Sequence, residues 1–370
     1  MPKSPRLTTA AAVSAAAVLA LSACGGDSDT DATSDGKTDA SASSSESSPV
    51  TLADPKPEDT KKVEDIDITE AKGKKAPSIS IEDKPLSVTE TTRKVLDEGS
   101  GETLPDDAYV EVDLAMFSGK DGKAIEGSET YTSAPIVLSL GNEGALPGLV
   151  KSIKGQKVGA HGVSVMPPKD LFGDQGMPQY GVDGKDNLVL VYDVRGIMPQ
   201  EAKGKAVTPK DKTLPTVKWK ADAPADITIP KDAPKPRKLV TEKLIEGTGK
   251  TVKKGDQVYV SYTGVKFKSG EVFDSSFKEG RGPFPFVVGQ QGVIPGWDKA
   301  VEGSKVGDRL LVVVPSKEGY GEQGTPDGSI KPNEDLVFVV DILSADHTEF
   351  LTLVDAIAAP RLSSRNGETA

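Results

Sequence analysis

Apolar and polar residues follow a strand-like pattern in the second half of the chain. Residues 258–262 place Val, Val and Tyr at every second position, and residues 310–314 and 336–342 are nearly continuous runs of Val, Leu, Ile and Phe. Alternation with a period of two and runs of β-branched residues are typical of β-strands. These segments therefore predict strands of an antiparallel sheet.

One short helix is expected among these strands. It covers residues 296–302, where Pro295-Gly296 opens it and Gly303 ends it, since these residues favour the first turn and the end of a helix. Trp297, Ala300 and Val301 recur at helical spacing, so they share the face that is buried. Several strands and one short helix predict an α+β fold, with the helix lying across the sheet.

The chain contains an internal repeat. A constant shift of 148 residues places residues 96–194 on residues 244–342 without a gap. Matching glycines and prolines include Gly99 with Gly247, Pro147 with Pro295, Gly148 with Gly296, Gly155 with Gly303, Gly159 with Gly307 and Pro167 with Pro315. Because Gly and Pro have special backbone requirements, chance does not keep them in register over such a length. The two regions are therefore expected to share one fold.

The N-terminus has the features of an export signal. Lys3 and Arg6 precede an Ala-rich apolar run over residues 7–21, which is shorter than the roughly 20 residues that a membrane-spanning helix needs. Residues 21–24 read Leu-Ser-Ala-Cys, which resembles a bacterial lipobox, and Cys24 is the only cysteine of the chain. Lipidation of Cys24 is therefore expected, and two or more acyl chains give stable anchoring. An ordinary secretory signal remains the alternative.

Composition narrows the possible functions further. The 45 Lys and Arg residues against 56 Asp and Glu residues give a formal charge of −11, which does not suit nucleic-acid phosphates. His161 and His347 are expected to be ordinary surface residues, so no metal site is predicted. Residues 24–75 are polar and lack aromatic residues, which predicts a disordered tether.

The second copy of the repeat carries six short motifs. They are residues 260–264 (Val-Ser-Tyr-Thr-Gly), 273–276 (Phe-Asp-Ser-Ser), 283–286 (Pro-Phe-Pro-Phe), 292–297 (Gly-Val-Ile-Pro-Gly-Trp), 319–321 (Gly-Tyr-Gly) and 336–338 (Leu-Val-Phe). In this order and at close to this spacing, they resemble the FKBP-type peptidyl-prolyl cis-trans isomerases. The resemblance implies two FKBP-like domains, each a curved antiparallel β-sheet around one short α-helix. It also implies rotamase activity on proline-containing polypeptides and inhibition by the macrolides that bind this family.

The residues present suit such a reaction. Rotation about an X-Pro bond crosses a barrier of roughly 18–20 kcal/mol because amide resonance is lost at the twisted midpoint. No bond is broken, so the reaction requires neither cofactor nor metal, and none is predicted. A catalyst needs an apolar socket for the proline ring and a few polar groups that favour the twisted amide.

The resemblance implies a role for individual residues. Trp297 would form the floor of the socket, and the Ile294 N–H and the Tyr320 hydroxyl would bond substrate carbonyl groups. Asp274 would supply a carboxylate at the rim, and Tyr262 would join the wall. The other expected wall residues are Phe273, Phe284, Val293, Ile330 and Phe338. Taken singly, each aromatic residue could instead be ordinary core.

The first copy departs from these motifs. At the same shift it has Leu114 for Tyr262, Ile125 for Phe273, Glu126 for Asp274, Ile136 for Phe284, Leu149 for Trp297, Phe172 for Tyr320 and Leu190 for Phe338. The residues that specify the fold are kept, whereas the aromatic and hydroxyl groups are lost. The first copy is therefore expected to fold but to isomerise weakly or not at all.

The expected organisation has six parts. They are a lipoprotein signal peptide (1–23), the tether (24–75), a degenerate FKBP-like domain (76–198), a linker (199–214), an FKBP-type isomerase domain (215–343) and a C-terminal tail (344–370). Residues 77–81 and 215–219 are expected to form strands leading into the two domains, with Trp219 in a packing role.

These features together predict an isomerase that assists the folding of exported proteins. It would be extracytoplasmic and anchored through lipidated Cys24 to the outer face of the bacterial cytoplasmic membrane. Two alternatives stay open: a chaperone or adaptor that binds proline-containing segments without significant turnover, and a structural lipoprotein of the wall or membrane.

Overall fold

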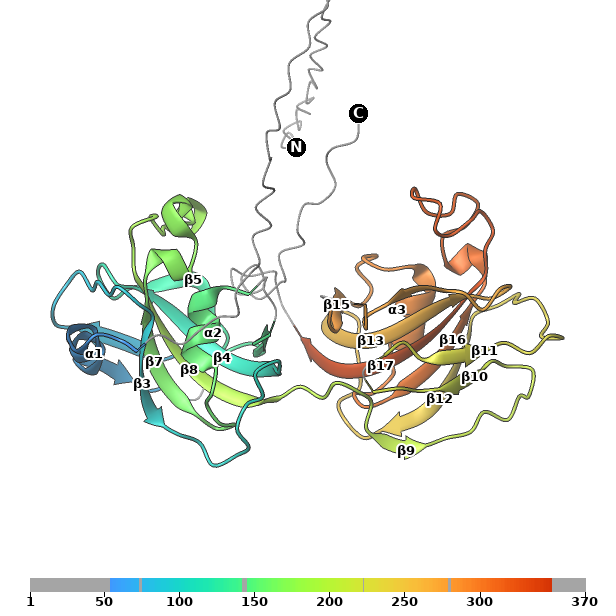
Figure 1. Ribbon diagram of the computed structural model, residues 1–370, viewed down its shortest axis with the longest axis horizontal. Coiled ribbons are helices and arrows are strands. Elements are labelled where there is room, and N and C mark those ends of the chain that lie inside the picture. Colours follow the sequence, from blue (N-terminus) through green and yellow to red (C-terminus); the bar gives the residue numbers. More distant parts are fainter. Residues whose placement is uncertain (1–53, 73–74, 142–144, 222, 279–280, 348–370) are drawn as a thin grey trace, which may run out of the picture. The chain divides into compact units, whose positions relative to one another are not determined.

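Two domains of the same architecture make up most of the structure (Figure 1). The computed structural model describes residues 54–72, 75–141, 145–221, 223–278 and 281–347. The expected signal peptide with Cys24, and the expected tail beyond residue 347, lie outside the described residues.

The C-terminal domain is an antiparallel sheet that curves around one short helix (Figure 1). Its elements are β12 (Val240–Gly247), β13 (Asp256–Lys266), β14 (Val272–Ser275), β15 (Phe284–Val287), α3 (Pro295–Val301), β16 (Arg309–Val314), the 3₁₀ turn η4 (Ser316–Glu318) and β17 (Leu336–His347). The strands lie in the order β14-β13-β17-β16-β12, and β15 pairs with β13 beside β14. The predicted helix and its buried face of Trp297, Ala300 and Val301 are confirmed.

The N-terminal domain repeats this order of elements. It contains β3 (Thr92–Asp97), β4 (Tyr109–Ser118), β5 (Ala124–Glu129), β6 (Ile136–Ser139), α2 (Pro147–Ile153), β7 (His161–Met166), the 3₁₀ turns η1 (Pro168–Asp170), η2 (Gly173–Gln175) and η3 (Pro178–Tyr180), and β8 (Leu188–Ile197). Its strand order, β3-β7-β8-β4-β5 with β6 on β4, matches that of the C-terminal domain. The predicted α+β fold in two copies is therefore confirmed.

The repeat is not free of gaps. In the C-terminal domain the Ser276 N–H donates to the Tyr262 carbonyl (3.1 Å), and in the N-terminal domain the same bond joins Thr130 to Leu114 (2.9 Å). Thr130 lies 146, not 148, residues before Ser276, and β5 shows a register irregularity against β4. The expectation of an ungapped repeat is therefore wrong at this strand, because β5 accommodates two additional residues as a bulge.

Each domain also carries an N-terminal β-hairpin on the outer face of its sheet. In the N-terminal domain, α1 (Pro57–Glu64) leads into β1 (Ile66–Thr69) and β2 (Ser78–Ile81); in the C-terminal domain the hairpin is β10 (Thr216–Lys218) and β11 (Asp226–Thr228). Ile68 pairs with Ile79 as Val217 pairs with Ile227. The repeated unit therefore begins earlier than the motifs indicate.

The first hairpin shows that the disordered tether expected over residues 24–75 is wrong for its last part, which contains α1 and β1. Val63 and Ile66 are almost fully buried, and they pack with Val163 and Val189 on the outer face of the sheet. Few apolar residues are enough here because the sheet face opposite them is itself apolar. Residues 57–69 of the expected tether therefore belong to a folded domain.

The expected linker of residues 199–214 also contains structure. Its strand β9 (Gly204–Ala206) pairs with β12 at the edge of the C-terminal sheet. A Cβ at Gly204 would lie 2.1 Å from the Glu246 carbonyl oxygen, so only glycine allows the strands to approach this closely. At the other end, β17 continues to residue 347, past the expected boundary at 343.

His161 is not the ordinary surface residue that was expected. Its side chain is only 15% exposed; Nδ1 lies 3.2 Å from an Asp193 carboxylate oxygen and Nε2 lies 3.2 Å from a Glu70 carboxylate oxygen. The imidazole therefore joins β7 and β8 to the segment that follows β1. The side chain of His347 lies outside the described residues.

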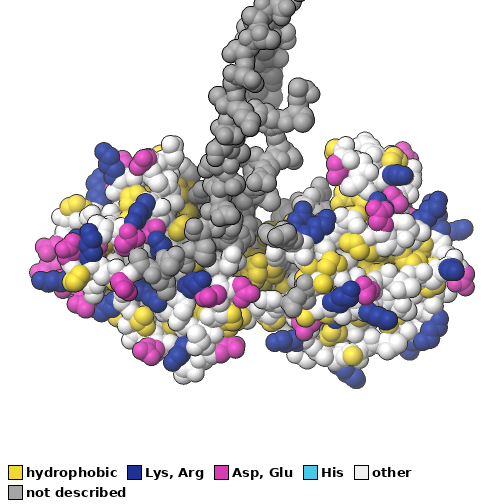
Figure 2. All heavy atoms as spheres, in the orientation of Figure 1, with side chains coloured by type: hydrophobic (Ala, Val, Ile, Leu, Met, Phe, Trp, Pro, Cys, Tyr) yellow, Lys and Arg dark blue, Asp and Glu magenta, His cyan; other side chains and the backbone are white. Residues whose placement is uncertain are grey.

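Charged side chains of both signs are interspersed over each domain on the face that Figure 2 shows. That face therefore presents no extended field of one sign. Within the described ranges, no helix combines the length and apolar character needed to cross a membrane.

Candidate functional site

Trp297 lies at the centre of an aromatic cluster in the C-terminal domain. The first turn of α3 places its indole beside Tyr262 of β13 (5.0 Å between ring centroids) and Phe338 of β17 (5.2 Å). Both contacts are edge-to-face, the arrangement that the ring quadrupoles favour. The helix and the two central strands therefore fix the indole from three directions.

Further aromatic rings extend the cluster toward the edge of the sheet. Phe273 of β14 packs edge-on against Phe338 (5.6 Å), and Phe284 of β15 packs edge-on against Trp297 (6.3 Å). A Cβ at Gly264 would come within 2.9 Å of the rings of Phe273 and Phe338, so a glycine on β13 provides the room for both.

The cluster is open on one side. Phe284 is 39% exposed, although Trp297, which it contacts, is 5% exposed, and Tyr320 is 38% exposed. Val293 and Ile294, which precede α3, are half-buried against the same cluster. Aromatic rings that bridge a buried floor and the solvent are a feature of ligand sites rather than of closed cores.

The indole N–H of Trp297 is buried and has no hydrogen-bond partner among the described residues. Buried polar groups are nearly always paired, so an unpaired donor indicates a place where something else binds or where strain is tolerated. Its position at the floor of the open cluster favours the first explanation.

Asp274 lies at the rim and is bonded to the wall of the cluster. Its carboxylate accepts from the Tyr262 hydroxyl (2.5 Å) and lies 3.1 Å from the Lys278 amine and 2.8 Å from the Arg281 guanidinium. Burial on its own would raise the pKa of Asp274, but these three donors outweigh it and hold the pKa below its ordinary value. The carboxylate is therefore ionised at neutral pH.

The two tyrosines keep their protons. Burial and then the bond to Asp274 raise the pKa of the Tyr262 hydroxyl, and burial and then the charge of Asp274 raise the pKa of Tyr320. Both hydroxyls are therefore hydrogen-bond donors throughout the physiological pH range. Tyr262 is already bonded to Asp274, whereas Tyr320 is 38% exposed and lies close enough for the charge of Asp274 to act on it.

The structure thus brings the residues expected from the sequence to one place. Tyr262, Ile294, Trp297, Phe273, Phe284, Val293, Ile330 and Phe338 share one cluster, Asp274 is bonded to it, and Tyr320 is near enough for the charge of Asp274 to act on it. Lys278 and Arg281 were not anticipated; two basic residues four and seven positions after Asp274 were the available signal. Phe286, 5.8 Å from Trp297, also belongs to the cluster.

The N-terminal domain fills the same place with aliphatic side chains. Leu114, Leu149 and Leu190 are each 1% exposed. Ile136, the counterpart of Phe284, is 6% exposed, whereas Phe284 is 39% exposed. Met177 and Tyr180 from the loop before β8 pack against this cluster, so side chains of the loop lie over it.

No carboxylate takes the position of Asp274 in that domain. The bulge in β5 places Ser128 opposite Met116, as Asp274 lies opposite Gly264, so the expected counterpart Glu126 is wrong. The Ser128 hydroxyl is occupied by the Ile125 carbonyl (2.6 Å), and Glu126 is exposed.

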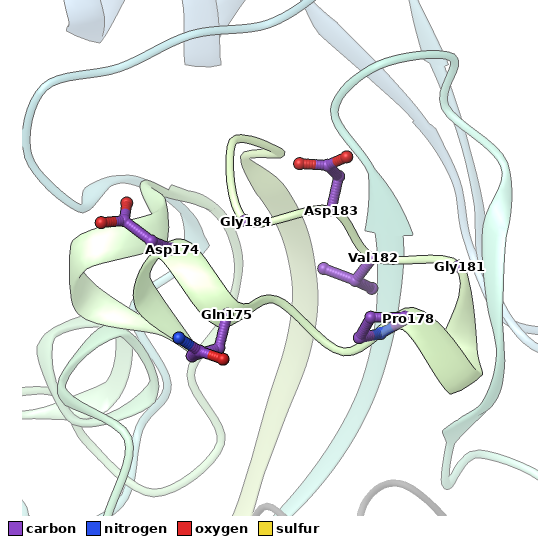
Figure 3. A pocket seen from close by; sticks show the side chains of 7 residues that line it. All are labelled: Asp174, Gln175, Pro178, Gly181, Val182, Asp183 and Gly184. Atoms are coloured by element: carbon purple, nitrogen blue, oxygen red, sulfur yellow. The ribbon is translucent and has the colours of Figure 1, made fainter.

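A separate hollow of about 340 Å³ lies in the N-terminal domain (Figure 3). It is formed by the loop over residues 174–184, with Asp174 and Asp183 among its lining residues. Among the residues that the structure describes, no group of three or more His, Cys, Asp or Glu side chains could hold a metal ion. The residues that line the hollow include no aromatic side chain, in contrast to the cluster around Trp297.

Comparison with known proteins identifies the class of this fold and site. Residues 101–195 and 248–343 both match the family model of the FKBP-type peptidyl-prolyl cis-trans isomerases. The chain belongs to this family, whose named members are rotamases.

Individual relatives agree with this assignment. The chain is 40% identical to an FK506-binding protein of Streptomyces anulatus over 109 residues. The aligned segment covers 30% of this chain and 87% of that protein. It is 38% identical to a probable FK506-binding protein of Corynebacterium glutamicum over 113 residues, and this segment covers 30% of this chain and 91% of that protein. The solved structure of the three FKBP domains of wheat FKBP73 aligns with 69% of this chain and 94% of its own, at 22% identity and a TM-score of 0.27. At that TM-score the alignment adds nothing to the family assignment.

Proposed function

We propose that the C-terminal domain catalyses cis-trans isomerisation of X-Pro bonds, and that the N-terminal domain does so weakly or not at all. The observation that carries this proposal is the open aromatic cluster around the Trp297 indole, whose N–H is buried and unpaired among the described residues. The N-terminal domain has aliphatic side chains at the same positions.

In this proposal the prolyl ring enters beside Phe284 and Tyr320 and lies on the Trp297 indole. The backbone N–H of Ile294, the residue that caps the N-terminus of α3, donates to one substrate carbonyl, because the first N–H groups of a helix have no partner within it. The Tyr320 hydroxyl donates to a second carbonyl. Donors that are fixed before the substrate arrives favour the twisted amide at no cost of reorganisation.

Asp274 has a supporting role at the rim. Its ionised carboxylate holds the Tyr262 hydroxyl, and its negative charge faces the polar edge of the twisting amide. The remaining steps need no proton transfer and no covalent intermediate, because the reaction changes only a torsion angle.

We also propose that the protein works outside the cytoplasmic membrane on exported polypeptides. The support is the sequence: a signal-like N-terminus, a lipobox ending at the only cysteine, Cys24, and a polar segment after it. Replacing Cys24 with Ser should release the protein from the membrane fraction and abolish incorporation of labelled fatty acid. Equal membrane retention of both forms would contradict the anchor.

The isomerase proposal is tested with the full chain in a proline-isomerisation assay on a model peptide. Trp297→Leu should lower kcat/KM by about tenfold or more, because the floor of the socket is lost. Leu149→Met, a volume-conserving change at the equivalent helix position of the N-terminal domain, is the matched control and should leave kcat/KM unchanged. Binding of the peptide by the wild-type chain without turnover would instead favour an adaptor.

A further inference from the structure

The outer face of the C-terminal sheet is apolar and is covered by the β10–β11 hairpin. The covered side chains are Val265, Leu311, Val313, Val337 and Val339, and the hairpin segment contributes Leu214, Val217, Trp219, Ile227 and Ile229. This segment precedes residues 248–343, the part that matches the isomerase family, so no family role attaches to it.

One hydrogen bond connects the hairpin to the strands of the site. The Ala225 N–H donates to the Thr263 hydroxyl (3.0 Å), and both residues are buried. The Thr263 oxygen lies 3.4 Å from the Ser275 hydroxyl, which donates to the Tyr262 carbonyl (2.9 Å). Because buried polar groups are costly to leave unpaired, these bonds fix β13 and β14 against each other beneath the hairpin.

A second contact holds the segment after β14. The Trp219 ring packs edge-on against Phe277 (5.5 Å), and the Phe277 N–H donates to the Ser275 hydroxyl (3.2 Å). On its other side, Trp219 lies under the guanidinium of Arg309 (3.7 Å to the ring centroid), which is paired with the buried Asp341. Trp219 therefore joins the rigid centre of the sheet to the residues beside Asp274.

The strand that carries Asp274 has little support of its own. β14 has four residues, lies at the edge of the sheet and pairs with β13 alone among the described strands. Short edge strands with few hydrogen bonds open readily. The distance between Asp274 and Tyr262 therefore depends on contacts from outside the sheet.

The N-terminal domain provides an internal comparison. Its hairpin has Pro77, which has no N–H, at the position of Ala225, and its strand β4 has Ala115 at the position of Thr263. The domain with the aliphatic cluster thus keeps a hairpin but lacks the polar connection. The polar connection between hairpin and sheet therefore occurs in the domain with the aromatic cluster and not in the domain with the aliphatic cluster.

We propose that the β10–β11 hairpin is a positioning element of the isomerase site, which holds β14 so that Asp274 stays bonded to Tyr262. The hairpin acts through the hydrogen bond from Ala225 to Thr263 of β13 and through the contact of Trp219 with Phe277. The inference rests on the proposed activity of the C-terminal domain and adds a segment outside the family match to its active unit.

The test compares variants of the full chain below their unfolding temperatures. Thr263→Val keeps the shape but removes the acceptor, and it should lower kcat/KM by about tenfold, mainly through kcat, since small displacements of a positioned group are costly. Thr263→Ser keeps the hydroxyl and should stay within about twofold of wild type. Ile79→Ala, which removes apolar contact from the equivalent hairpin of the N-terminal domain, should lower the unfolding midpoint of that domain but not kcat/KM.

A fluorescence readout makes the coupling measurable without turnover. The chain has two tryptophans, so Trp219→Phe leaves Trp297 as the only indole and keeps a ring against Phe277. Adding Thr263→Val to this variant should shift the Trp297 emission.

The outcomes separate the two proposals. Unchanged kcat/KM and unchanged emission in Thr263→Val would overturn the positioning role, and so would an equal loss of kcat/KM in Ile79→Ala. A wild-type chain without turnover would contradict the proposed activity, whereas the emission shift would still support the coupling of the hairpin to the site.

Discussion

The stability of the N-terminal domain should decrease between neutral and mildly alkaline pH because of His161. The imidazole bridges Asp193 and Glu70, each 3.2 Å from one ring nitrogen. The bond to Asp193 first, and the charges of both carboxylates, raise the pKa of His161 to about 9 against the cost of burial. In the unfolded chain the pKa returns to about 6.5.

The direction of the effect follows from this difference. A pKa that is raised in the folded state contributes stability that is fully present below pH 6.5 and is lost as the pH rises through about 9. The full difference corresponds to at most about 3 kcal/mol, at about 1.4 kcal/mol for each pH unit. Since Glu70 is 62% exposed, solvent screens its share, and about 1–2 kcal/mol is expected.

The assay has two parts. The chain has two histidines, so ring-proton NMR of wild type and His161→Gln assigns the resonance and gives its pKa directly. Protection factors of the β7 and β8 amides at pH 6 and pH 9.5, which are corrected for the base-catalysed intrinsic exchange rate, then measure the loss of stability. His161→Arg, which copies Arg309 at the equivalent position of the C-terminal domain, should remove the pH dependence. A His161 pKa near 6.5, or equal protection factors at both pH values in wild type, would refute the reasoning.

Two further predictions concern the C-terminal domain. Gly264→Ala should lower kcat/KM and cost about 1–3 kcal/mol of stability, because the new methyl group meets the rings of Phe273 and Phe338. Gly292→Ala is the control, because the space around its Cβ is open. Equal activity of the two variants would contradict the close packing of the two rings against Gly264. Asp341→Ala should destabilise the domain by about 3–5 kcal/mol in urea unfolding, because it leaves the buried Arg309 guanidinium with only the partly exposed Glu201 carboxylate, 3.6 Å away. A loss under about 1 kcal/mol would contradict the buried pair.

The site could be predicted from the sequence because its residues lie in short motifs on regular strands. Trp297 has a fixed place after the Pro-Gly that opens α3, and Tyr262 and Phe338 lie on adjacent central strands, so the period of two brings them to the same face. The aliphatic replacements in the first copy follow the constant shift at Leu114, Leu149 and Leu190.

The two-residue bulge in β5 could not be predicted in this way. At the constant shift, Ser128 falls on Ser276, and this identity conceals the gap. The hydrogen bond from Thr130 to the Leu114 carbonyl, which shows the true correspondence, depends on how the strand bends.

The hairpins could be predicted only in part. The strands expected at residues 77–81 and 215–219 contain β2 and β10, whereas their partners β1 and β11, four and three residues long, lie in polar segments. Whether such short strands dock depends on the apolar outer faces of the two sheets, and those faces are known only once the strand register is known. The chain's own pattern near Ile66 and Ile227 therefore carries too little information.

The most direct test of the account is the rate of proline isomerisation by the full chain with Trp297→Leu beside the wild type and Leu149→Met. The account predicts turnover by the wild type, a loss of about tenfold or more in Trp297→Leu and none in Leu149→Met. A Trp297→Leu chain that is as fast as the wild type would contradict the claim that the open aromatic cluster of the C-terminal domain is the active site.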